Sequence, residues 1–223
     1  MSEILKELVT TARTLVAEGL VTGAGGNVSA RDGDSMWISP SGFSLSEAAE
    51  ADYARVSLAT GELLSGERRP SSEVLMHLAI LRARPEVGVV LHAHPRFVNA
   101  LATAGHELRA TYPDFHVYLG GNVAHLEYIT VTTAELADRV GAAFAAPDCH
   151  GMVHANHGTI TVGASAKESL FRSLAMEEQA EILWRALAVG EPRYLSDAEK
   201  AELDRLGSEE YRRELLARMG SSG

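Results

Sequence analysis

The sequence predicts an α/β fold in a single domain, and three observations carry that prediction. Hydrophobic residues make up 46% of the 223 residues and charged residues 22%, which is the composition of a globular chain. Segments with the period of amphipathic helices alternate with short β-branched runs. No linker, repeat or low-complexity run separates them, so we assign residues 1–219 to one domain and expect residues 220–223 to be a disordered tail.

The first half of the chain predicts two helices and two hairpins. Residues 3–18 repeat apolar side chains at helical spacing, and Gly19 supplies a stop signal. A glycine-rich loop follows at residues 21–27. Runs of apolar residues around turn signals then predict strands at residues 28–30, 36–39, 56–58 and 62–64. A second helix is expected over residues 73–81, with serines at its start and Pro85 beyond its end.

The second half predicts strands and helices in alternation. The expected strands are residues 87–94, 117–119, 125–131, 151–156 and 159–162, which are rich in β-branched and apolar side chains. The expected helices are residues 95–103, a segment that opens at 132–135, residues 166–189 and a charged tail at 196–219.

Charge and cysteine content narrow the classes of partner. With 20 Lys and Arg against 30 Asp and Glu, the net charge is −10, which opposes contact with nucleic acid or an anionic membrane surface. The single cysteine, Cys149, cannot form an intrachain disulfide, and no window approaches 18 uncharged apolar residues. We therefore expect a cytoplasmic protein. A small anionic substrate is compatible with this charge, because a metal ion or a ring of amides reverses the field locally.

Two histidines at the end of an expected strand give the strongest chemical signal. His92 and His94 are two residues apart, so they project from one face of the strand and can share a metal ion. A hydrogen-bonded core pair would show the same spacing. For a third ligand we favour His157, where Gly158 breaks the strand, over its rival His154. We take the other histidines as structural or surface groups.

The start of the second helix has two interpretations. Ser72 can cap the helix while Glu73 complements its dipole. Alternatively, the helix amides and the hydroxyls of Ser71 and Ser72 form an anion site, with Glu73 as a general base beside a metal. The glycine loop before the first strand does not match the dinucleotide fingerprint, although its amides can still bind an anion.

Five short motifs occur in the order and spacing of one family. They are residues 25–29 (Gly-Gly-Asn-Val-Ser), 39–42 (Ser-Pro-Ser-Gly), 70–73 (Pro-Ser-Ser-Glu), 92–95 (His-Ala-His-Pro) and 156–158 (Asn-His-Gly). On these motifs the chain resembles the class II aldolase/adducin family, most closely its fuculose-phosphate aldolase branch, over about residues 5–200. The resemblance implies a central, mostly antiparallel sheet flanked by helices, and a homotetramer with active sites between subunits.

The resemblance also implies roles for individual residues. A divalent ion, usually zinc, would be held by His92, His94 and His157, with Glu73 as the catalytic acid and base. Tyr211 lies near the position of a C-terminal tyrosine that gives a proton to the aldehyde oxygen. The implied phosphate site comprises Asn27, Ser41, Gly42, Ser71 and Ser72.

Two departures from the family pattern bear on the substrate. Ala24 stands where the fuculose-phosphate enzymes typically have a phosphate-binding threonine. The segment at residues 112–116 also differs from the one that carries an active-site tyrosine in those enzymes. Tyr112 can take the place of that active-site tyrosine, whereas Asp114 and His116 would equally suit a different substrate.

The implied reaction is reversible cleavage of a ketose 1-phosphate to dihydroxyacetone phosphate and an aldehyde. The ion would act as a Lewis acid on the developing enediolate. A metal-dependent decarboxylase of an aromatic or 3-oxo acid is the alternative, and a non-catalytic scaffold like the adducin head domain is a third possibility that the retained histidines and Glu73 oppose. Imidazole ligands accept zinc, manganese, cobalt and iron alike, so the sequence leaves the ion open.

Overall fold

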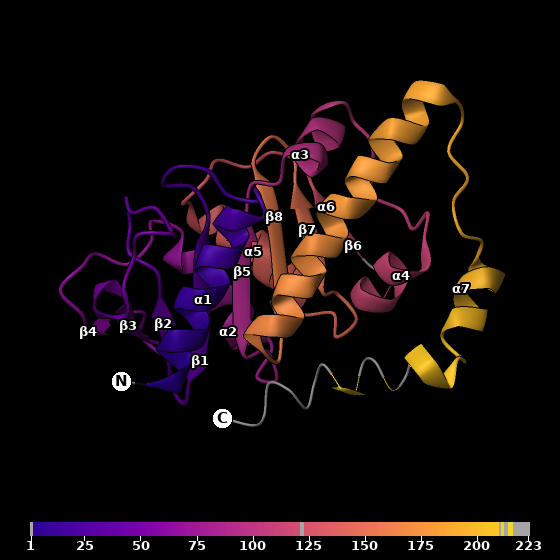
Figure 1. Ribbon diagram of the computed structural model, residues 1–223. Coiled ribbons are helices and arrows are strands. Elements are labelled where there is room, and N and C mark those ends of the chain that lie inside the picture. The colour runs from indigo at the N-terminus through magenta and orange to yellow at the C-terminus, as the bar shows by residue number, and fades with distance from the viewer. Residues whose placement is uncertain (1, 121–122, 210, 212–213, 216–223) are drawn as a thin grey trace.

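An eight-stranded sheet forms the centre of the computed structural model, which describes residues 2–120, 123–209, 211, 214 and 215 (Figure 1). The strand order is β4-β3-β2-β1-β5-β8-β7-β6. All neighbours pair antiparallel except β6 and β7, which confirms the mostly antiparallel sheet. The strands are β1 (Asn27–Asp32), β2 (Ser35–Ile38), β3 (Ala54–Ser57), β4 (Leu63–Ser65), β5 (Val89–Ala93), β6 (Val123–Leu126), β7 (Gly151–His154) and β8 (Gly158–Gly163).

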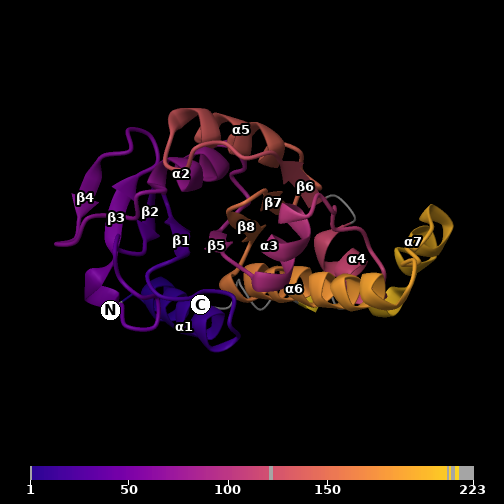
Figure 2. The same ribbon diagram turned by 90° about the horizontal axis from the view of Figure 1, so that it is seen from above.

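Helices cover both faces of the sheet, as the view from above shows (Figure 2). Helices α2 and α5 pack against one face and against each other, while α1, α3 and α6 lie on the other. The helices are α1 (Glu3–Ala17), α2 (Val74–Ala83), α3 (Arg96–Thr103), α4 (Pro113–Leu119), α5 (Ala134–Phe144), α6 (Ala166–Val189), α7 (Asp197–Leu203) and the 3-10 helix η1 (Glu50–Asp52). None of the described helices is both long and apolar enough to cross a membrane.

Strand register decides which side chains face α2. His92 lies opposite Asn27 on β1 and opposite Ile160 on β8, and Ile160 belongs to the core beneath α2 and α5. Directly opposed residues share a sheet face, so Asn27 and His92 point toward α2. Leu91 and Ala93 point the other way, into the core formed with α1. The central strands thus carry polar side chains to the α2 face at one end of the sheet.

One expected strand is a helix. Residues 117–119 were predicted as a strand from their β-branched and aromatic side chains, but they form the last turn of α4. Pro113 at the first helical turn presets the backbone angle, and Gly120 ends the helix in the left-handed region at φ 67°. These end signals outweigh the β propensity of three residues.

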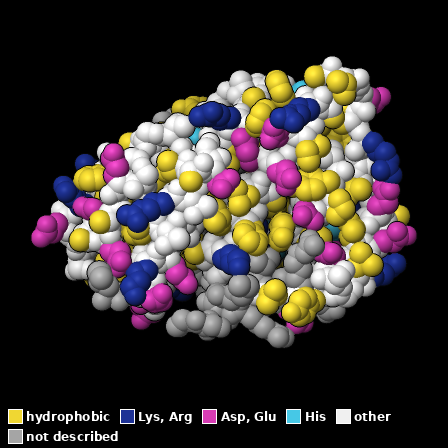
Figure 3. Space-filling view, in the orientation of Figure 1, with side chains coloured by type: hydrophobic (Ala, Val, Ile, Leu, Met, Phe, Trp, Pro, Cys, Tyr) yellow, Lys and Arg dark blue, Asp and Glu magenta, His cyan; other side chains and the backbone are white. Residues whose placement is uncertain are grey.

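Other boundaries differ less from expectation. β6 ends at Leu126, so residues 127–131 are not a strand, and β7 ends at His154 because Asn156 takes φ 57° in the turn to β8. The charged tail contains α7, which ends at Leu203. The expected disordered tail at residues 220–223 lies outside the described residues. Basic and acidic side chains are interspersed on the face shown in Figure 3, without a continuous basic patch among its coloured atoms.

Candidate metal centre and active site

Three histidines from two neighbouring strands meet at one end of the sheet. His92 is near the end of β5, His94 follows that strand, and His157 lies in the turn between β7 and β8. One ring nitrogen of each lies within 4.8 Å of the others. Among the described residues, this is the only such group of histidine, cysteine, aspartate and glutamate. The structure therefore brings together the three residues expected to bind a metal.

Glycines allow this close approach. A Cβ on Gly158 would lie 2.3 Å from the carbonyl oxygen of Ala93, so any larger residue would push β8 away from β5. Gly26 has φ 67°, and a Cβ there would lie 2.8 Å from the carbonyl oxygen of His92. Both glycines thus let the backbone pass beside the histidines at the distance that the cluster needs.

Neighbouring groups orient two of the rings. His92 Nδ1 donates to the carbonyl oxygen of Thr159 at 2.9 Å, which turns Nε2 toward the cluster. His154, the rival candidate, is not one of the three, but its Nδ1 lies 3.0 Å from Nδ1 of His157. Such contacts behind a ligand ring fix its orientation.

Glu73 lies at the start of α2 with 8% of its surface exposed, against the cluster. Its Oε2 is 3.1 Å from His92 Nε2 and accepts a hydrogen bond from Asn27 Nδ2 at 2.8 Å. Burial alone would raise the pKa of Glu73. The charge on His92 and the hydrogen bonds from His92 and Asn27 outweigh burial and hold the pKa below its usual range. Glu73 is therefore held as a carboxylate.

The donor set fits a divalent metal ion. Burial lowers the pKa of His94 to about 4 and that of His157 to about 3, so both rings are neutral at pH 7 and offer lone pairs. Glu73 Oε1 is buried, lies 3.5 Å from His157 Nε2 and has no hydrogen-bond partner among the residues that the structure describes. Three histidine nitrogens beside a buried carboxylate oxygen form a donor set that fits a divalent metal ion and leaves a fourth position open.

Three of the five expected phosphate residues, Asn27, Ser71 and Ser72, lie beside Glu73 in space or along the chain. Ser71 is buried and accepts the Glu73 N–H on its hydroxyl, and its own N–H donates to the carbonyl oxygen of Ser39. Ser41 donates its N–H to Arg69, so the loops at residues 39–42 and 69–72 run side by side. Asn27 is buried, whereas Ser72 and Gly42 are exposed at the rim.

The expected tyrosines are not part of this cluster within one chain. Tyr211 is 63% exposed, and none of the described hydrogen bonds joins it to the histidines. Tyr112 donates its hydroxyl to Glu178 on α6 at 2.8 Å. His116 lies 3.1 Å from Asp204 and so links α4 to the end of α7.

The sequence interpretation missed His77, which it took as a structural or surface group. His77 is fully buried four residues after Glu73 and contacts Asn27. Its spacing from Glu73 on a helix was the available signal, since residues four apart share a helix face.

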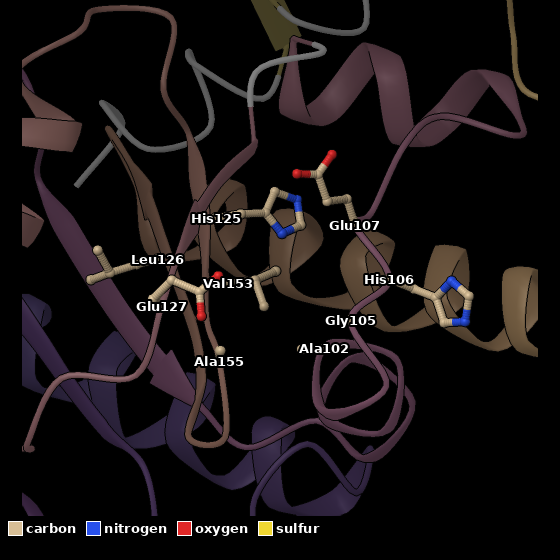
Figure 4. Close-up of a pocket in the computed structure, with 9 residues that line it drawn as sticks. All are labelled: Ala102, Gly105, His106, Glu107, His125, Leu126, Glu127, Val153 and Ala155. Carbon is tan, nitrogen blue, oxygen red and sulfur yellow. The ribbon is translucent and has the colours of Figure 1, made fainter.

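A pocket lies on the opposite face of the sheet from the histidine cluster (Figure 4). Val153 and Ala155 line it, and they flank His154, which points the other way. Glu107 and His125 lie side by side there, while His106 projects away from them (Figure 4). These side chains do not form a group of metal ligands among the described residues, so the histidine site is the stronger candidate.

Comparisons with known proteins agree with the geometry. The family model described as "Class II Aldolase and Adducin N-terminal domain" matches residues 6–184. The chain is 36% identical to a 5-methylthioribulose-1-phosphate/5-deoxyribulose-1-phosphate aldolase of Rhodospirillum rubrum over 192 residues, which are 84% of this chain and 83% of the relative. It is 33% identical to a 5-deoxy-D-ribulose 1-phosphate aldolase of Bacillus thuringiensis, covering 89% of this chain and 92% of the relative.

A solved structure of an L-fuculose 1-phosphate aldolase has the same fold. It superposes with a TM-score of 0.85 at 30% identity, over 95% of this chain and 97% of that one. A family model that matches most of the chain, relatives above 30% identity and a shared fold all agree. The chain belongs to the family of class II aldolases and adducin N-terminal domains.

Proposed function

We propose that this chain is a metal-dependent class II aldolase that cleaves a ketose 1-phosphate reversibly to dihydroxyacetone phosphate and an aldehyde. The observation that carries this proposal is the convergence of His92, His94 and His157 on a point beside the unpartnered Oε1 of Glu73. Such an arrangement offers a Lewis-acid site and a base within reach of one substrate. The chain is thus a carbon–carbon lyase rather than a scaffold.

The substrate class that we propose is a 5-deoxyribulose or 5-methylthioribulose 1-phosphate. Two relatives named for these sugars are 36% and 33% identical to this chain, whereas a fuculose phosphate aldolase of Methanococcus maripaludis is 29% identical. Cleavage of the C3–C4 bond of 5-deoxyribulose 1-phosphate would release acetaldehyde, and the methylthio sugar would release methylthioacetaldehyde. Fuculose 1-phosphate itself, which the motifs suggested first, becomes a comparison substrate.

Each residue has a defined task in this reaction. A divalent ion held by the three histidines, zinc in the first instance, supplies Lewis-acid stabilisation of charge on the substrate oxygens. Glu73 takes the proton of the C4 hydroxyl as the C3–C4 bond breaks, and its carboxyl group returns a proton to C3. In the reverse direction Glu73 removes that proton from dihydroxyacetone phosphate. Asn27 and the Ser41 and Ser71 loops hold the phosphate with N–H and O–H donors.

The assembly proposed here is a cytoplasmic homotetramer. Tyr211 is 63% exposed in one chain, so we place it in the active site of a neighbouring subunit, where it gives a proton to the aldehyde oxygen in synthesis and passes the C4 hydroxyl proton on to Glu73 in cleavage. The exposed rim residues Gly42 and Ser72 suit a site that is completed between subunits.

Product analysis of the metal-loaded enzyme tests the proposal. The protein is incubated with 5-deoxyribulose 1-phosphate, fuculose 1-phosphate and the unphosphorylated sugars, and dihydroxyacetone phosphate is followed with a coupled dehydrogenase. We expect cleavage of the phosphorylated sugars, with the 5-deoxy sugar preferred, and no cleavage after chelation. Ala24 in place of a threonine favours the decarboxylase alternative, so 3-oxo acids are assayed for CO₂. Release of CO₂ without triose phosphate from any sugar would contradict the proposal.

A further inference from the structure

His77 occupies an enclosed position between the active site and the sheet. It is 0% exposed and lies on the first turn of α2 after Glu73. Its ring contacts two alternate residues of β1. Nδ1 is 2.7 Å from Ser29 Oγ, and Nε2 is 2.5 Å from Asn27 Oδ1. Asn27 in turn donates to Glu73, so four side chains form one hydrogen-bonded row that ends on the carboxylate.

For a neutral His77 ring, only one arrangement of hydrogens satisfies this row. The Glu73 carboxylate can only accept, so the Asn27 amide must present its nitrogen to Glu73 and its oxygen to His77. A carbonyl oxygen also only accepts, which means that His77 Nε2 must carry the ring hydrogen. Nδ1 then accepts from the Ser29 hydroxyl. Every donor in the row points toward Glu73, and such aligned donors polarise one another.

The reverse arrangement would disturb Glu73. With the ring hydrogen on Nδ1, His77 Nε2 would need a donor, and the Asn27 amide would turn its nitrogen toward the ring. The carbonyl oxygen of Asn27 would then face Glu73 Oε2 across the 2.8 Å that now holds a hydrogen bond. Two buried acceptors at this distance repel each other, because neither has a hydrogen to share. The choice of ring nitrogen therefore decides which end of Asn27 meets the carboxylate.

Burial excludes an acid–base role for His77. Its enclosure lowers the pKa to about 3, and the charge on His92 lowers it further against the opposing effect of Glu73. The ring is thus neutral under working conditions and carries a single N–H. Because the ring stays neutral, His77 can serve as a fixed hydrogen-bond donor.

We propose that His77 is a positioning residue, which holds the Asn27 side chain with its amide nitrogen, and not its oxygen, facing Glu73 and the phosphate of the substrate. The Asn27 nitrogen has two hydrogens, and one is committed to Glu73. No hydrogen bond among the described residues uses the second, which is therefore available to an anion in the adjoining loop site. The phosphate part of this inference rests on the proposed function, whereas the orientation of Asn27 does not.

The ring tautomer is the most direct test and needs no substrate. The protein is labelled with ¹⁵N-histidine, and two-bond correlations between ring protons and nitrogens are recorded between pH 6 and 8. The signals of His77 are assigned by their absence in His77→Gln. We expect the hydrogen on Nε2 throughout this range. A hydrogen on Nδ1, or a mixture of both forms, would overturn the proposal.

Two substitutions separate positioning from packing. His77→Gln keeps an amide N–H that can reach Asn27, whereas His77→Leu fills the space without a donor. For zinc-loaded protein, we expect Leu to weaken inorganic phosphate binding and raise KM by about tenfold or more, the scale of one charge-assisted hydrogen bond. The phosphate affinity and the KM of the His77→Gln variant should stay within about threefold of the values for the parent chain. Ser29→Ala, which leaves the Nε2 hydrogen in place, serves as the matched control.

The outcomes distinguish this inference from the proposed function. If the His77→Gln and His77→Leu variants lose phosphate affinity equally, and lose thermal stability to match, His77 has a packing role and the positioning role is refuted. If the Leu variant does not fold, the tautomer of the parent chain decides the question. A parent chain that neither binds phosphate nor cleaves any ketose phosphate would refute the proposed function. The Nε2 tautomer would still support the orientation of Asn27.

Discussion

The buried His77 predicts a specific loss of stability in acid. A histidine whose pKa is lowered by folding binds fewer protons in the folded than in the unfolded chain, so stability rises with pH. For His77 the window extends from the unfolded value of 6.5 down to the folded value of about 3. Proton linkage over this window gives a loss of about 2 kcal/mol at pH 5 relative to pH 8, and about 5 kcal/mol below pH 3.

Urea unfolding of the metal-free protein at pH 8 and pH 5 measures this effect. His77→Gln has no titrating group at this position, so its loss of unfolding free energy between the two pH values should be smaller than that of the parent chain by about 2 kcal/mol. His106→Gln, at an exposed position, is the matched control and should behave as the parent chain does. Equal losses in the His77→Gln and parent proteins would show that His77 is not held neutral by burial.

Three further predictions concern the site and the fold. His92→Ala, His94→Ala and His157→Ala should each lose bound metal and activity together, as elemental analysis and assay of the same samples will show; a variant that keeps a full metal complement would remove that residue from the ligand set. Glu73→Gln should retain the metal but lower kcat by about 100-fold or more, the usual scale for an acid–base group, and undiminished turnover would exclude its role. Phe115→Ala removes a ring on the buried side of α4 that is 1% exposed and should cost about 3–5 kcal/mol in unfolding free energy, against well under 1 kcal/mol for a surface change such as Glu107→Ala.

Local patterns were enough to predict much of this architecture. The spacing of His92 and His94 needed only the two-residue period of a strand, and Ser165 and Ser196 cap α6 and α7 as their residue types favour. Local propensity failed at residues 117–119, where Pro113 and Gly120 fix a helical turn. That failure reflects competition between two local signals rather than a missing one.

The spacing of residues along the sequence could not predict contacts between distant segments. His154 and His157 lie three residues apart, and the φ of 57° at Asn156 accompanies the turn in which His157, and not His154, joins the cluster. The hydrogen bond from His92 to Thr159 depends on β5 pairing with β8. The row from Ser29 through His77 and Asn27 to Glu73 requires β1 to lie beneath α2, a packing relation that no short motif encodes.

The ligand set is tested most directly by diffraction from zinc-loaded crystals, with anomalous differences collected on either side of the metal edge. We predict one strong peak at about 2.0–2.1 Å from Nε2 of His92, His94 and His157, the usual zinc–nitrogen distance. A peak that lacks any of these three nitrogens as a neighbour, or density for the ion only elsewhere on the chain, would contradict the metal centre described here.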